Sequence, residues 1–154
     1  MFLNAPHNVV FNTEFIGLKF IDLIYQVWCV ALKEENYFID LASAPTIQQM
    51  KGLETTILTG LQDEKMMMVL NTTLPGHTVP THSHPHEQIG MVHSGKAFLK
   101  IGEKERIVKK GDFYSIPPNV PHSDRCIGKK PFVMLDIFYP IRQDFIEKIE
   151  RKKF

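Results

Sequence analysis

The spacing of apolar residues changes near residue 36. From there to the C-terminal region, short runs rich in Ile, Val, Phe and Thr alternate with turn residues every eight to twelve positions. This spacing predicts many short strands, as in an all-β sandwich or barrel. None of these runs alternates with a long helical pattern, which argues against a parallel α/β sheet. The expected strands are 55–59, 65–74, 88–93, 96–101, 105–108, 113–116 and 131–139.

Two segments show their periodicity clearly. In 96–101, the apolar residues Ala97, Leu99 and Ile101 fall on one side of an extended chain. In 142–152, Phe145 and the isoleucines that follow it form an apolar stripe at helical spacing, so a short C-terminal helix is expected.

The most apolar stretch is 15–32, but three polar residues interrupt it. It therefore falls short of the roughly 20 apolar residues that a membrane span needs, and it lacks the features of a secretory signal. Its periodicity fits an amphipathic helix, although the same residue types also form strands. An interface helix, an accessory element and a stretch without a fixed fold all remain open. We expect residues 1–35 to be an accessory segment and residues 36–154 to be the main domain.

Length and composition exclude several classes of protein. A chain of 154 residues is the usual size of one domain. Eighteen Lys+Arg against seventeen Asp+Glu give a net charge of +1, without the basic surplus of a nucleic-acid binder. Two cysteines, Cys29 and Cys126, exclude a disulfide-rich scaffold. We expect a cytoplasmic protein with a small-molecule ligand and no nucleic-acid or membrane partner.

Histidines gather in the middle of the chain. On an extended strand His82 and His84 point to the same face, so both imidazoles can reach one metal ion. Imidazole suits Zn, Cu, Fe and Ni. Gln88 could add an amide oxygen or Glu87 a carboxylate, but neighbours on a strand face opposite ways, so only one would reach the site.

A second cluster surrounds His122. Prolines at 117, 118 and 121 would fix the direction of the backbone there. Strands before and after the turn would carry His122 into a barrel interior as a third imidazole. The alternative is an exposed histidine tract that binds metal only adventitiously.

These two clusters resemble the two sequence motifs of the cupin superfamily. The first motif is matched by Gly76, His82, His84, Gln88 and Gly95, with Gln88 where the family has Glu. The second is matched by Gly111, Pro117, Asn119, His122 and Cys126, with Asn119 replacing Gly and Cys126 replacing Asn. Asn is a mild change, because it tolerates the left-handed backbone of a turn glycine. The resemblance covers residues 36–142.

The resemblance implies a small single-domain cupin β-barrel (a double-stranded, jelly-roll-like β-helix) that forms a homodimer. It also implies one divalent transition-metal ion, such as Zn, Ni, Mn, Fe or Co. The implied ligands are His82, His84, Gln88 and His122. A neutral Gln ligand leaves the ion with its full charge, which favours Lewis-acid chemistry and disfavours oxygen chemistry.

A further local match involves the run HSHPHEQIGMVHSG and the later element Asp136-x-Phe138-x-x-x-Arg142. Together they resemble the small cupins that open the ring of 4,5-unsaturated uronates to the open-chain keto form. This resemblance implies that Asp136 is the acid/base, Phe138 a pocket wall and Arg142 a carboxylate clamp. An enol ether needs a proton delivered to carbon, and a carboxylate suits a bidentate guanidinium.

Other interpretations stay open. Asp136 and Arg142 could form a structural salt bridge with Phe138 as ordinary core. The chain could be a non-catalytic metal- or sugar-binding module or a cupin dioxygenase. A phosphosugar isomerase would need basic residues in its pocket, whereas the cations of 100–110 mostly alternate outward.

Overall fold

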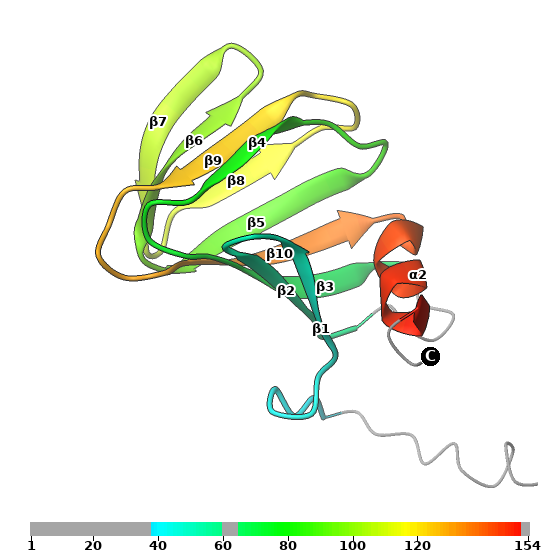
Figure 1. The fold of residues 1–154 in the computed structure, drawn as a ribbon. Coiled ribbons are helices and arrows are strands. Elements are labelled where there is room, and N and C mark those ends of the chain that lie inside the picture. Colours follow the sequence, from blue (N-terminus) through cyan, green and yellow to red (C-terminus); the bar gives the residue numbers. More distant parts are fainter. Residues whose placement is uncertain (1–37, 60–64, 152–154) are drawn as a thin grey trace, which may run out of the picture. The chain divides into compact units, whose positions relative to one another are not determined.

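The computed structural model describes residues 38–59 and 65–151. The expectations for residues 1–35, including the helix in 15–32, lie outside the described residues. Figure 1 shows the elements, which follow in chain order. They are β1 (Thr46–Met50), β2 (Leu53–Ile57), β3 (Met67–Thr73), β4 (Thr78–His82), β5 (Glu87–Ser94), β6 (Lys96–Ile101), β7 (Lys104–Lys109), β8 (Phe113–Ile116), β9 (His122–Cys126), β10 (Phe132–Tyr139) and α2 (Gln143–Arg151).

The strands form two antiparallel sheets (Figure 1). One has six strands in the order β1-β2-β3-β10-β5-β8, and the other has four in the order β4-β9-β6-β7. This arrangement confirms the predicted all-β fold with a short C-terminal helix. No helix in residues 38–59 or 65–151 has both the length and the apolar character needed to cross a membrane.

Three strands, β1, β4 and β9, were not among the predicted ranges. On β9 the buried side chains are His122, Asp124 and Cys126. His122 and Asp124 line a cavity, whereas Cys126 packs in the apolar core. An inward face with two polar residues shows no hydrophobic alternation, so the sequence pattern did not reveal this strand. The other seven strands lie within two residues of their predicted ends.

Two apolar clusters flank the site. The first joins the two sheets through residues such as Val92 and Leu99. The second includes Phe138 of β10 and Phe145 of α2. The predicted helical stripe is confirmed, since Phe145 is buried and the two isoleucines after it pack against the same cluster.

Strand register puts the polar residues of the six-stranded sheet in rows. Tyr114, Gly90 and Asp136 lie opposite one another on β8, β5 and β10. Gln88 lies two residues before Gly90 and therefore shares its face. Side chains far apart in the chain are thus brought to one inner surface.

Candidate metal centre and cavity

Three histidines converge from two strands and a connection. His82 ends β4 and lies opposite His122, which begins β9. His84 follows in the connection between β4 and β5. One potential ligand atom from each ring lies within 4.8 Å of the others. His84 and His122 are buried, while His82 is exposed.

The second motif contacts the first through its turn. Asn119 adopts a left-handed φ of 63°, the conformation that a glycine would adopt most easily. Its N–H donates to the carbonyl of His84 at 2.8 Å. The turn before His122 thereby also fixes the backbone at His84.

Backbone carbonyls determine which ring nitrogens face the centre. In each of the three histidines, Nδ1 lies 2.9–3.1 Å from a main-chain carbonyl oxygen two residues away. This contact places the proton on Nδ1 and leaves Nε2 with a free lone pair. Each ring is therefore prepared as a metal ligand.

Protonation of the buried rings supports the same conclusion. Burial, with smaller effects from the positive charge of Arg142 and from His122, lowers the pKa of His84 to about 4. Burial also lowers the pKa of His122. Both rings are neutral near pH 7, and neutral imidazole is the form that binds metal.

Gln88 adds an oxygen beside His84. Its Nε2 donates to Asp136 Oδ1 at 2.9 Å, which orients the amide and turns Oε1 toward His84 Nε2, 3.1 Å away. With the His84 proton on Nδ1, His84 Nε2 and Gln88 Oε1 are both acceptors, so a hydrogen bond does not explain the 3.1 Å between them. Two ligands about 2.1 Å from one ion and at right angles are roughly 3 Å apart. The donor set therefore fits a divalent ion, whereas Glu87 is exposed.

Asp136 is fully buried and accepts three hydrogen bonds. Besides Gln88, it accepts from Tyr114 Oη at 2.5 Å and from Asn71 Nδ2 at 2.8 Å. Burial raises the pKa of Asp136, although these three donors oppose the shift. Burial and the nearby Asp136 also raise the pKa of Tyr114, which keeps its hydroxyl as a donor.

Asp124 is a second buried carboxyl in the cavity wall, and the sequence analysis missed it. Thr73 Oγ1 donates to its Oδ1 at 3.2 Å. Burial raises the pKa of Asp124 to about 7, and Asp136 adds to this while the Thr73 hydrogen bond opposes it. The available signal was its position two residues after His122, on the same face of an extended strand.

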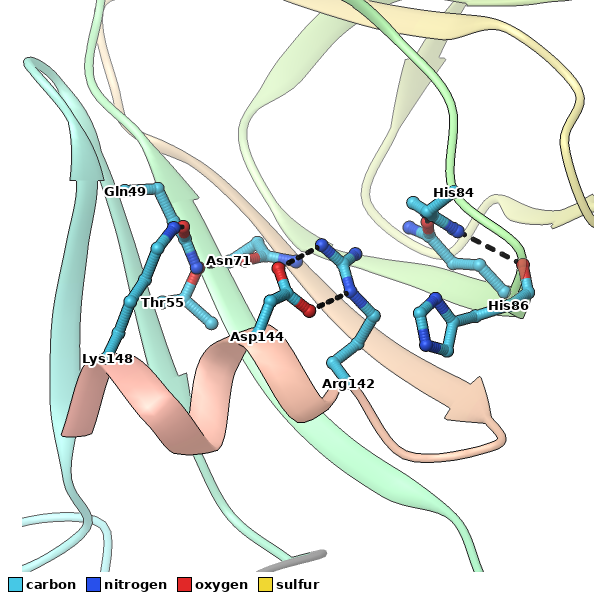
Figure 2. A network of polar contacts seen from close by, with 9 residues as sticks. Gln49, Thr55, Asn71, His84, His86, Arg142, Asp144 and Lys148 are labelled. Atoms are coloured by element: carbon cyan, nitrogen blue, oxygen red, sulfur yellow. Dashed lines mark hydrogen bonds and ion pairs between the residues drawn. The ribbon is translucent and has the colours of Figure 1, made fainter. Parts of the chain in front are cut away.

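Arg142 lies just before α2 and pairs with Asp144 (Figure 2). Its Nε and Nη2 donate to the two carboxylate oxygens at 2.9 and 2.8 Å. Its guanidinium carbon lies 5.2 Å from the centre of the Phe138 ring. The ion pair of Arg142 is thus with Asp144, not with Asp136 as the structural alternative required.

All seven residues singled out by sequence line one cavity of about 330 Å³. Phe138 forms part of its wall, edge-on to the His84 ring at 5.5 Å. The lining residues that sequence reasoning did not find include Asn71, Tyr114, Asp124 and Lys148. Tyr114 and Asn71 carry no local signal, because their contacts depend on strand register.

Comparisons with known proteins find relatives of the domain that holds this site. Residues 69–138 match the family model of the cupin domain. The H2HPP isomerase of Bacillus subtilis is 37% identical over 71 residues, which span 45% of this chain and 30% of that protein.

Solved structures show the same fold. An RmlC-like cupin from Shewanella frigidimarina has a TM-score of 0.64 and 23% identity, covering 72% of this chain and 96% of that one. KdgF from Halomonas sp. has a TM-score of 0.64 and 22% identity, covering 71% of this chain and 98% of that one. The family match shows a cupin domain over residues 69–138, and the likeness to these solved structures shows that the chain shares their fold.

Proposed function

We propose that this cupin is a metal-dependent enzyme that opens the ring of 4,5-unsaturated uronates to the open-chain keto form. The observation that carries the proposal is a single cavity lined by three histidines, Gln88, Asp136 and Arg142. A metal-binding set, a carboxylic acid and a guanidinium are the groups that such a reaction requires. The Bacillus subtilis relative is named an isomerase, which agrees with a reaction that rearranges its substrate.

His82, His84, His122 and Gln88 would hold the ion, one of Zn, Ni, Mn, Fe or Co. Such an ion would polarise substrate oxygens as a Lewis acid. The protein's part is to keep the rings of His84 and His122 neutral through their burial. The carbonyl contacts of all three histidines direct their Nε2 atoms inward.

Asp136 is the proposed acid/base. The ring opens when the anomeric hydroxyl loses its proton and the bond between the anomeric carbon and the ring oxygen breaks. The enol that this leaves takes up one proton at carbon and becomes the ketone, and a positioned carboxyl can deliver that proton. Tyr114 and Asn71 hold the Asp136 carboxylate in place from the side of β8 and β3. The same carboxylate orients Gln88, so acid and metal ligand are fixed relative to each other.

Arg142 is the proposed carboxylate clamp. Asp144 occupies its Nε and one Nη2 hydrogen. A guanidinium has five N–H donors, so others remain for a substrate carboxylate. The Phe138 ring lies 5.2 Å from the guanidinium carbon and forms part of the cavity wall beside it.

The test combines metal analysis with turnover. We expect about one bound divalent ion per chain, and loss of the ultraviolet band of a 4,5-unsaturated uronate on incubation. The variant His82→Ala/His122→Ala should lose both. Asp136→Asn should keep the ion but lose turnover by roughly 10²–10⁴-fold, the usual contribution of a general acid.

A matched arginine provides the control. Arg142→Ala should raise KM. Arg125→Ala, which removes an exposed arginine stacked on Phe98, should change neither KM nor kcat. Bound metal without any loss of the ultraviolet band would contradict the proposed enzymatic activity and favour a non-catalytic binding module. An unchanged KM in Arg142→Ala would refute the clamp.

A further inference from the structure

One side of the cavity is built by α2 and β1 rather than by the cupin motifs. Gln49 of β1 and Lys148 of α2 both line it, together with Arg142 and Asp144. Figure 2 shows Lys148 reaching from the helix to Gln49, on the other side of the Arg142–Asp144 pair from His84. Neither Gln49 nor Lys148 has a role in the metal centre or in the proposed proton transfer.

The charges on this side are not balanced. Arg142 is neutralised by the bidentate contact with Asp144. Lys148 has no ion pair with any carboxylate in residues 38–59 or 65–151, and its Nζ donates to the neutral Oε1 of Gln49. One positive charge therefore remains in the wall of the cavity.

Gln49 also has an unused donor. Its Nε2 is buried and has no hydrogen-bond partner in the described part of the chain. A buried donor left without an acceptor costs free energy. Because Lys148 occupies Oε1 of the same amide, the orientation of Nε2 is set before any ligand binds.

We propose that Lys148 and Gln49 form a subsite for the carboxylate of the substrate, with Lys148 supplying the charge and Gln49 Nε2 a second hydrogen bond. One uncompensated cation and one neutral donor match a single negative charge, so the ligand is a monoanionic acid rather than a phosphate ester. The identity of that acid as a uronate rests on the proposed function.

The subsite lies next to the clamp. Arg142 Cζ and Lys148 Nζ lie 4.2 and 6.0 Å from the centre of the same Phe145 ring. A carboxylate bound by Lys148 and Gln49 is therefore also near the free N–H groups of Arg142. The carboxylate subsite and the histidines are different parts of the cavity. The arrangement therefore selects an acid that carries its carboxylate on one side and other oxygens, directed to the histidines, on another.

Binding of unreactive probes tests this subsite apart from catalysis. Calorimetry on the full-length, metal-loaded protein would compare D-glucuronate with D-glucose, which lacks the carboxylate. We expect the wild type to prefer glucuronate by about tenfold or more, as a charge-assisted contact allows. In Lys148→Gln, the ratio of glucuronate affinity to glucose affinity should fall close to one. The same is expected of Gln49→Glu, because the introduced carboxylate would pair with Lys148 and repel the ligand.

Controls keep the outcomes distinct. Arg151→Gln removes a charge from the same helix outside the cavity and should leave the preference unchanged. Metal content and glucose affinity should be equal in all variants, which excludes misfolding. No preference in the wild type, or an unchanged one in Lys148→Gln, would overturn the subsite. A wild type that prefers glucuronate but leaves the unsaturated uronate intact would refute only the proposed reaction.

Discussion

Gln88 departs from the cupin motif, and Asp136 gives the physical reason. Asp136, on β10, accepts a hydrogen bond from the amide N–H of Gln88. A glutamate at this position would set two carboxylates against each other in a buried space, where like charges raise each other's pKa. The amide avoids this repulsion and still offers one oxygen to the ion.

Asp124 gives the metal-free protein a pH-dependent stability. Its pKa is raised from 3.8 to about 7 by burial, so the folded state keeps a proton that the unfolded state releases. Between pH 3.8 and about 7, the free energy of unfolding must therefore decrease as the pH rises, and above about pH 7 it must become constant. A shift of this size corresponds to roughly 4 kcal/mol at most.

The measurement is urea unfolding from pH 4 to 8 with a chelator present, for the wild type and Asp124→Asn. The asparagine keeps an acceptor for Thr73 but cannot ionise. We expect the stability of the wild type relative to the variant to decline across this range. A constant difference between the two proteins would contradict the raised pKa.

At the scale of elements, the row Tyr114–Gly90–Asp136 needs a residue without a side chain in the middle. A Cβ at Gly90 would overlap both the Tyr114 ring and Asp136 Oδ1. Gly90→Ala should therefore separate the Tyr114 hydroxyl from Asp136 and destabilise the fold by about 1–3 kcal/mol, as overpacking does. Turnover should fall as well, because Asp136 loses a contact that positions it.

Gly128→Ala is the matched control. A Cβ there makes only ordinary contacts with Lys96 and Lys130. Its unfolding midpoint in urea and its turnover should stay close to those of the wild type. Equal stability and equal turnover of Gly90→Ala and Gly128→Ala would show that the row is not tightly packed.

At the scale of the whole molecule, the predicted homodimer remains a prediction, and the six-stranded sheet offers a surface for it. Phe113 lies on β8, the last strand of that sheet, and is 69% exposed. On the same outer face, Ile89 and Ile137 are paired on neighbouring strands and are also exposed. Apolar residues grouped this way are typical of interfaces.

Light scattering should give twice the chain mass of 17.8 kDa for the wild type. Phe113→Lys should shift the protein to the mass of one chain, because an unpaired charge is costly in a desolvated interface. Ile107→Lys, on the edge strand of the other sheet, is the control and should leave the dimer intact. A monomeric wild type would refute the homodimer.

Much of the fold and part of the site could be predicted from the sequence, because the signals are local. Alternation along a strand is set by neighbouring residues, so seven strands and the helical stripe of Phe145 were visible in the pattern. The proline turns before His122 likewise act through the backbone close by. The predicted pairing of His82 with His84 held, although the two do not share a strand: β4 ends at His82, and His84 lies in the connection that follows.

Only the tertiary structure decided how the remaining groups meet. The partner of Gln88 lies 48 residues away, and that of Lys148 lies 99 residues away. Such contacts depend on strand register and on where α2 packs, which no short window of sequence contains.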